Sequence, residues 1–231
     1  MTLKRKREDV SIDMFKDRRD AGGHLVKALK KYETDDVVVL GIARGGVVVG
    51  YEVAKGLKAT LEVIMPRKIP IPWNPEAGFG AITEDGTTVL NEPLVEYLRL
   101  RGDEIKEVSM KVLREIKRRI RKYRGDRPFP DIDQKIVILV DDGLASGFTM
   151  IAAIEMVKKY TPKRIVVAVP VSPRTSINRV RPLVDELVCL YVQEYGDFAV
   201  ASYYEEFPDI SDEEVLAYLK TRPVPKDIMK V

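Results

Sequence analysis

Two adjacent carboxylates at the end of a predicted strand have the clearest chemical potential. Asp141 and Asp142 follow the apolar run Ile136–Val140 and precede a glycine-containing turn that leads into a predicted helix: Gly143, Leu144, Ala145, Ser146, Gly147, Phe148 and Thr149. Ligands of open α/β sheets bind beyond the carboxyl ends of the strands. A turn that opens a helix offers backbone N–H groups and the positive end of the helix dipole to a phosphate. The acids suit hydroxyl groups or a metal ion, so the motif fits a ribose 5-phosphate.

Competing nucleotide-binding motifs do not match this segment. A Walker A loop requires a lysine after its second glycine, whereas Phe148 follows Gly147 here, and a dinucleotide-binding GxGxxG is absent. A purely structural Asp-Asp-Gly turn is an alternative. It leaves the apolar run and the spaced hydroxyls of Ser146 and Thr149 without a role.

Two further strand ends carry groups suited to an anion. The run Val37–Leu40 leads into Ala43, Arg44, Gly45 and Gly46, where the glycines let backbone approach a ligand. The run Leu61–Met65 leads into Arg67 and Lys68, and if the two strands are neighbours these cations face the same anion. Considered alone, the Gly45-Gly46 pair is also explained by a simple turn after a strand. Considered alone, Arg67 and Lys68 are also explained as basic residues exposed to solvent.

The elements that must position these groups alternate between strand and helix. The five apolar, β-branched runs are Val37–Leu40, Leu61–Met65, Ile136–Val140, Ile165–Val169 and Leu187–Val192, and predicted helices span 46–57, 91–124, 148–160 and 173–182. This alternation predicts an α/β fold with a doubly wound, mostly parallel five-stranded sheet flanked by helices. In 91–124 one apolar stripe recurs at helical spacing, and Gly102 predicts a division into two helices.

Residues 66–90 are too long for an ordinary connection. Their first half holds four prolines, so it is predicted not to be helical, and the whole excursion is expected to be exposed. A hairpin with Asp85-Gly86 at its turn is predicted to follow. Such an excursion is typical of a functional lid, in which Trp73 and Phe79 are either anchors or ordinary packing.

The two ends of the chain are predicted to form a small hood beside the sheet. An amphipathic helix is expected over 12–32, and residues 194–221 are aromatic and acidic. The pair Ser211 and Glu214 has the spacing of a capping box, which predicts a short final helix.

Composition excludes several function classes. The 231 residues carry a net charge of +3, and no apolar stretch is long enough to span a membrane. With Cys189 as the single cysteine and His24 as the single histidine, an internal disulfide, a histidine-based metal site and a Ser-His triad are not expected. The start of the chain lacks a secretory signal pattern, so a cytoplasmic location is expected. Basic clusters at Lys4–Arg7 and Arg114–Arg124 suit solvated segments better than nucleic acid.

The segment IVILVDDGLASGFT resembles the phosphoribosyl pyrophosphate (PRPP) motif of type I phosphoribosyltransferases. The resemblance implies that Asp141 and Asp142 engage the ribose 2′- and 3′-hydroxyls, in part near Mg²⁺, and that residues 143–149 wrap the 5-phosphate. It assigns Ala43–Gly46 and the Arg67-Lys68 pair to pyrophosphate and residues 66–90 to a flexible catalytic loop. Ser146 stands where threonine is usual and Phe148 where a small residue is common. The segment Phe15–Gly22, FKDRRDAG, is similar to the N-terminal helix of a poorly characterised branch of that family.

The resemblance implies a single phosphoribosyltransferase domain over 1–231, with its core at about 33–192 and its hood at about 12–32 and 194–221. The expected activity is Mg²⁺-dependent transfer of a phosphoribosyl group from PRPP to a nitrogenous acceptor, in a homodimer. Arg174 is either an acceptor contact or a solvated loop residue. The alternative from another class is a PRPP- or nucleotide-sensing regulator without turnover. A PRPP synthetase fits less well, because ATP-binding features are missing.

Overall fold

A parallel sheet forms the centre of the computed structural model, which describes residues 14–223. Its order is β2-β1-β6-β7-β8, and every neighbouring pair is parallel, which confirms the predicted five-stranded sheet. The strands are β1 (Val37–Ile42), β2 (Thr60–Ile64), β6 (Ile136–Val140), β7 (Arg164–Pro173) and β8 (Glu186–Gln193). The basic cluster Lys4–Arg7 lies outside the described residues.

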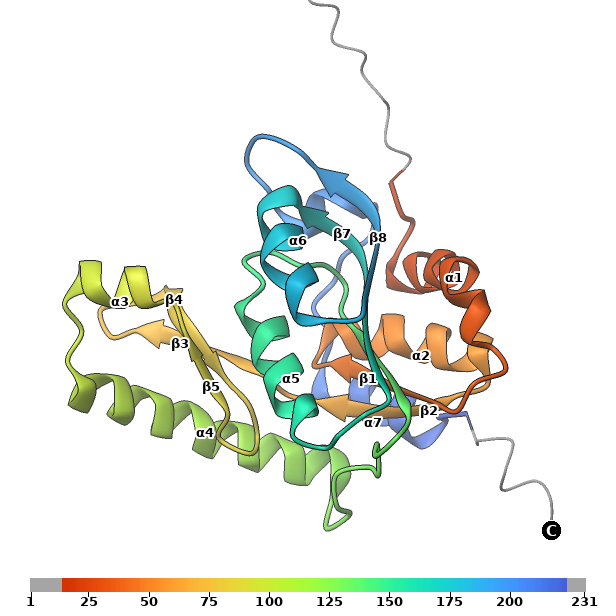
Figure 1. Ribbon diagram of the computed structural model, residues 1–231, viewed down its shortest axis with the longest axis horizontal. Coiled ribbons are helices and arrows are strands. Elements are labelled where there is room, and N and C mark those ends of the chain that lie inside the picture. The colour runs from red at the N-terminus through yellow and green to blue at the C-terminus, as the bar shows by residue number, and fades with distance from the viewer. Residues whose placement is uncertain (1–13, 224–231) are drawn as a thin grey trace, which may run out of the picture.

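Helices cover both faces of this sheet (Figure 1). Alternate residues of a strand point to opposite faces, and β1 shows this directly. Val37 and Val39 pack with α1 (Arg18–Leu29) and α2 (Gly45–Leu57), whereas Val38 and Leu40 pack with α5 (Phe148–Lys158) and α6 (Arg174–Val180). Because both of their faces are buried, β1 and β6 are apolar along their length rather than alternating. The fold is therefore the doubly wound α/β architecture that the sequence predicts.

The excursion after β2 forms a second sheet, which we call the arm together with the two helices that follow it. Strands β3 (Arg67–Ile71), β4 (Asn74–Ile82) and β5 (Thr88–Leu90) pair antiparallel in the order β3-β4-β5. Figure 1 shows the arm extending to one side of the central sheet. The β4–β5 turn carries Asp85 and Gly86, and Gly86 has a φ of 90°, so the hairpin prediction is confirmed.

The prediction that residues 66–78 are not helical is confirmed, since this stretch forms β3 and the first part of β4. Proline is tolerated on edge strands and at bulges. β3 is an edge strand, and its register with β4 shifts on both sides of Pro70. Phe79 is fully buried and belongs to the packing of the core, whereas Trp73, at the tip of the β3–β4 hairpin, is 61% exposed.

The arm is completed by α3 (Glu92–Leu98) and the long helix α4 (Gly102–Arg124). The break before Gly102 confirms the predicted division into two helices. The apolar stripe of α4 packs on the core through Ile116 and Tyr123, which are buried, and through partly buried neighbours. Most basic residues of α4 are exposed, as expected for a solvated helix, but Arg124 at its end is buried, so the expectation was wrong for that residue.

The two ends of the described chain lie together. Phe15 N–H donates to the Tyr203 carbonyl (2.9 Å), and Glu205 N–H donates to the Phe15 carbonyl (2.8 Å). The helix α1 is shorter than predicted, because Asp17 caps it by accepting from the N–H groups of Arg19 and Asp20, and the 3-10 helix η1 (Lys30–Tyr32) follows it. At the other end α7 (Asp212–Lys220) begins with the predicted capping box of Ser211 and Glu214. Within residues 14–223, no helix combines the length and apolarity that a membrane crossing requires.

Candidate functional site

The paired acids stand at the carboxyl end of β6. Asp142 N–H donates to Asp141 Oδ1 (2.9 Å), so the two residues form a compact turn directly after the strand. Burial raises the pKa of Asp141 well above its usual range, and the adjacent charge of Asp142 raises it further. Two carboxylates held this closely carry an unfavourable charge that a hydroxyl-rich or cationic ligand would relieve.

The turn after the acids is held from outside by β7 and α6. Leu144 is buried, and its N–H donates to the Val171 carbonyl (2.9 Å). The Ser176 hydroxyl donates to the Ala145 carbonyl and the Arg179 guanidinium donates to the Ser146 carbonyl. The Leu144 N–H is used in this packing and two carbonyls are tied outward, so the N–H groups of residues 145–149 at the start of α5 remain for an anion.

Glycines let the end of β1 touch the acids. A Cβ atom on Gly45 would lie 1.9 Å from Asp142 Oδ2, and one on Gly46 would lie 2.6 Å from the Val140 carbonyl oxygen. The peptide between Ala43 and Arg44 is cis, and α2 begins at Gly45. The structure therefore brings the Arg44-Gly45-Gly46 segment and the Asp141-Asp142 pair, predicted separately, into direct contact.

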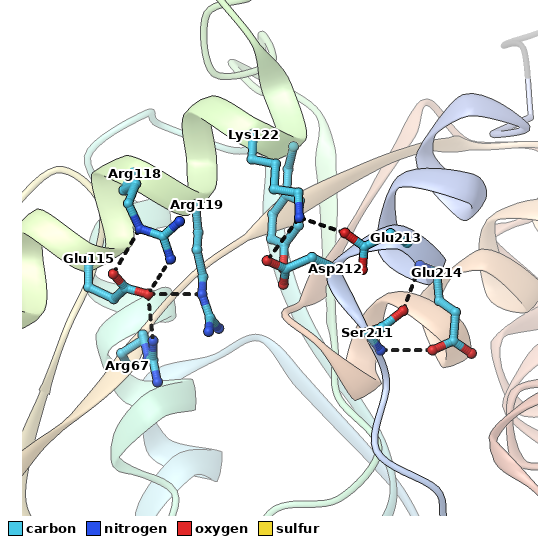
Figure 2. Close-up of polar contacts among 10 residues, drawn as sticks. Arg67, Glu115, Arg118, Arg119, Lys122, Ser211, Asp212, Glu213 and Glu214 are labelled. Atoms are coloured by element: carbon cyan, nitrogen blue, oxygen red, sulfur yellow. Dashed lines mark hydrogen bonds and ion pairs between the residues drawn. The ribbon is translucent and has the colours of Figure 1, made fainter.

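The basic pair Arg67 and Lys68 lies at the beginning of β3, the first strand of the arm, and not in a loop. Arg67 is half-buried beside α4, and its NH1 lies 4.0 Å from Glu115 Oε1 (Figure 2). Lys68 lies across the β3–β4 hairpin, where its ammonium donates to the Glu76 carbonyl. Successive strand residues point to opposite faces, so the two predicted cations have different partners.

Arg67 shares its surroundings with other cations. Burial lowers the pKa of its guanidinium, the charge of Arg119 lowers it further, and Arg44 adds to this effect, while Glu115 opposes it. The ends of β1 and β2 therefore place Arg44 and Arg67 within electrostatic reach of each other, as adjacent strands should.

Arg18, to which the sequence patterns assign no role in the site, contacts the acids. Its Nε donates to Asp142 Oδ2 (2.7 Å), its NH1 donates to the Pro208 carbonyl (2.7 Å), and its guanidinium stacks 3.7 Å from the Phe207 ring centre. The Tyr204 hydroxyl donates to the Asp142 carbonyl (2.6 Å). Burial raises the pKa of Tyr204, and Asp142 raises it further, so the phenol stays a donor. The hood thus orients one of the acids.

Arg174 lies apart from this cluster. It forms an ion pair with Glu194 (2.5 Å between NH2 and Oε1) at the start of α6, and both side chains are about half exposed. Within residues 14–223, no group of three or more His, Cys, Asp or Glu side chains could enclose a metal ion. A cation here would rely on the two acids, water and ligand oxygens, which is the coordination that Mg²⁺ prefers.

A model of one protein family matches residues 11–202 of this chain, and its description is phosphoribosyl transferase domain. Two curated proteins of Mycobacterium tuberculosis, from strains CDC 1551 / Oshkosh and H37Rv, are each 40% identical over 208 residues, which is 90% of this chain. Both are named, provisionally, as phosphoribosyl transferases. The chain spans about half the length of these relatives, 47%.

A solved structure matches the fold closely. The crystal structure of TT1426 from Thermus thermophilus aligns with a TM-score of 0.74 and 37% sequence identity. The alignment covers 89% of this chain and 97% of that protein. The likeness therefore extends beyond the central sheet to most of the described residues.

Proposed function

The chain belongs to the phosphoribosyl transferase domain family, and from this premise we propose that it transfers the 5-phosphoribosyl group of PRPP to a nitrogen atom of a base-type acceptor. The observation that carries the proposal is the contact between Gly45 and the Asp142 carboxylate. It joins a segment suited to ribose phosphate to one suited to pyrophosphate.

The acids and the turn after them form the ribose-phosphate half of the proposed site. Asp141 and Asp142 accept from the 2′- and 3′-hydroxyls, and Arg18 holds the Asp142 carboxylate by one oxygen, which leaves acceptor capacity on the other. The turn 143–149 wraps the 5-phosphate and binds it through its N–H groups at the start of α5, other than that of Leu144, which donates to Val171. The outward ties of Ala145 and Ser146 keep that turn in one shape.

The ends of β1 and β2 form the pyrophosphate half. In the reaction the acceptor nitrogen bonds to C1′, the bond from C1′ to the pyrophosphate oxygen breaks, and the nitrogen loses a proton. Arg44 and the N–H groups of residues 44–46 stabilise the charge that grows on the departing pyrophosphate, and Arg67 adds a second guanidinium. Lys68 joins them only if it releases the Glu76 carbonyl to which it donates.

Mg²⁺ is the cation that suits this chemistry. Burial and the like charge of Asp142 raise the pKa of Asp141, and this pair of acids fits a divalent ion close by. When bound, Mg²⁺ would neutralise charge on the pyrophosphate oxygens. The two acids and substrate oxygens would hold it.

The acceptor is expected to enter beside the hood. Arg174 would have to leave Glu194 to contact it. The aromatic residues Phe15, Tyr203 and Tyr204 are buried against one another and are not free to stack on a base. The expected homodimer rests on the family resemblance and the expected cytoplasmic location on the sequence pattern, and both stay predictions.

A binding measurement tests the ribose-phosphate half. Calorimetric titration of PRPP with Mg²⁺ should give binding in the natural protein and none in the Asp141→Asn, Asp142→Asn double variant. Asp126→Asn, at an exposed carboxylate outside the site, is the matched control and should bind normally. Unchanged PRPP affinity in the double variant would refute the site assignment.

An activity panel separates a transferase from a regulator. PRPP is offered with purines, pyrimidines, nicotinate, quinolinate and anthranilate, and pyrophosphate release is measured. Release with one class of acceptor supports the transferase. Tight PRPP binding with no release across the panel would favour the sensing regulator instead.

A further inference from the structure

Three arginines converge on one carboxylate within the arm, between β3 and α4. Glu115 Oε1 lies 2.8 Å from Arg118 NH2, 3.1 Å from Arg119 Nε and 4.0 Å from Arg67 NH1. Figure 2 shows Glu115 between these side chains, with the guanidinium ends of Arg67 and Arg119 extending past it on the side away from α4. Two of the three cations come from α4, which the family motifs leave without a role.

This cluster has more positive charge than the carboxylate can balance. Besides burial, the charges of Arg119 and Arg44 lower the pKa of Arg67, so three guanidinium groups act on one another here. The Nε of Arg119 is buried, and its approach to Glu115 lacks hydrogen-bond geometry. A buried guanidinium nitrogen without a hydrogen bond is costly, and an anion with several oxygens would satisfy it.

We propose that Arg119 is a third pyrophosphate-binding arginine, beside Arg44 and Arg67, and that Glu115 holds the place of the anion until pyrophosphate binds. The proposal rests on the proposed function, because Arg44 and Arg67 are its pyrophosphate half. It assigns a role to α4: the helix supplies a charge to the site as well as an apolar stripe to the core.

The contacts of Glu115 allow its carboxylate to move away from Arg67 and Arg119 when an anion binds. Its strongest contact is the paired hydrogen bond from Arg118, through Nε (3.0 Å) and NH2 (2.8 Å), and the Arg118 side chain is 65% exposed. Glu115 can keep this bond on the solvent side while pyrophosphate takes Arg67 and Arg119. It also borders a cleft of about 360 Å³ between β3 and α4, which gives its carboxylate room to move.

The first test is calorimetric titration of inorganic pyrophosphate with Mg²⁺ into the full chain. Arg119→Gln should weaken binding at least tenfold, since a charge-assisted hydrogen bond is lost. Arg119→Lys keeps the charge without the planar fork and should lose less. The matched control is Lys117→Gln, which removes one positive charge from an exposed position of the same helix and should leave the affinity within about twofold.

The second test is Glu115→Gln, which removes the competing carboxylate. Pyrophosphate should bind several-fold more tightly to this variant. If Glu115 served only to hold Arg118 and Arg119 in place, the same substitution would weaken binding or leave it unchanged. Either of those results would overturn the placeholder role.

The outcomes separate this inference from the proposed function. If the natural protein binds PRPP through Asp141 and Asp142 but Arg119→Gln and Arg119→Lys bind pyrophosphate as it does, the inference is overturned and the proposed site stands. The same holds if free pyrophosphate does not bind. If Arg119→Gln weakens pyrophosphate binding while no acceptor supports release from PRPP, the inference stands and the transferase is refuted.

Discussion

At the scale of single residues, the site holds two adjacent carboxylates whose like charges are unfavourable without a ligand. Asp141 lies directly beside Asp142, and only one of the two has a guanidinium partner within the described residues, through Arg18. Burial and the neighbouring charge raise the pKa of Asp141. A group whose pKa is raised on folding favours its protonated form in the folded state, so its ionisation at neutral pH costs stability. Such a cost is typical of residues retained for binding.

Asp141→Asn should therefore stabilise the ligand-free protein at pH 7, by about 1 kcal/mol as is common for stabilising substitutions. The amide oxygen can still accept from Asp142 N–H, so the turn is preserved. The gain should shrink as pH falls through the raised pKa, because Asp141 of the natural protein is then neutral as well. Urea unfolding at a series of pH values measures this. Asp126→Asn serves as control, and a loss of stability at pH 7 would contradict the prediction.

The part of the site that follows recognisable strands could be predicted from the sequence. The part that depends on contacts between residues far apart in the sequence could not. Asp141, Asp142, Gly45 and Gly46 each follow a recognisable strand, so their meeting at one sheet edge could be expected. Arg18 reaches Asp142 across 124 positions of sequence. The available signal was the segment Phe15–Gly22, with its run of charge and its similarity to the N-terminal helix of a branch of the family, and it names no partner for Arg18.

At the scale of elements, the arm is fixed to the central sheet by buried charges. Arg124, at the end of α4, is 5% exposed. Its NH1 lies 2.6 Å from Glu84 Oε1 in the β4–β5 turn, and its NH2 donates to the Val63 carbonyl of β2 (2.7 Å). Burial raises the pKa of Glu84, and the charge of Arg124 opposes this effect. One side chain thus connects α4, which carries Arg119, to β2 and to the β4–β5 turn.

Arg124→Met should destabilise the protein by about 3–5 kcal/mol, because it leaves buried Glu84 without its cation. Without that cation the pKa of Glu84 rises further, so the deficit should narrow as pH falls and the carboxyl becomes neutral. Guanidinium unfolding at pH 5 and pH 8 measures both effects. Arg121→Met, exposed on the same helical turn, should cost little.

A double variant sharpens this test. Adding Glu84→Gln to Arg124→Met removes the unpaired charge, so the double variant should be more stable than the sum of the single losses predicts. Strict additivity would mean that the ion pair does not hold the arm.

The elements differed in how far the sequence revealed them. The five central strands were predictable because short, β-branched runs bounded by charge or glycine suit strands buried on both faces. β3 was not predictable from the sequence, because Pro70 suggests a break in a strand. Proline is tolerated there since β3 is an edge strand with a bulge, and only the pairing with β4 reveals both features. A helix such as α4 shows its apolar stripe in the sequence, but not that Arg119 turns toward Arg67.

At the scale of the whole molecule, the candidate site lies where three parts meet. The central sheet supplies the acids and the glycine segment, the arm supplies Arg67 and Arg119, and the hood supplies Arg18. Figure 1 shows α1 and the arm on opposite sides of the central sheet. A ligand that contacts all three parts would couple their positions, since it stabilises only the arrangement that binds it.

Arg18 is the residue that should link the hood to the site, because it contacts Asp142 and two residues of the hood. Its guanidinium joins Asp142 to the Pro208 carbonyl and stacks on Phe207, and the pair with Asp142 is almost fully buried, with side chains 8% and 17% exposed. Arg18→Met keeps much of the apolar stem but leaves Asp142 without its cation. We expect a loss of about 3 kcal/mol in stability, together with faster hydrogen exchange in α1 and in residues 203–210.

The same variant should bind PRPP more weakly, because Asp142 is no longer held in one orientation. Arg19→Met is the matched control: Arg19 neighbours Arg18 but bonds to the Tyr218 hydroxyl (3.0 Å) at the surface. Its exchange pattern near residues 203–210 and its PRPP affinity should match the natural protein. If Arg18→Met loses stability yet binds PRPP with unchanged affinity, the Arg18–Asp142 pair is a packing contact, and the hood contributes nothing to the site through it.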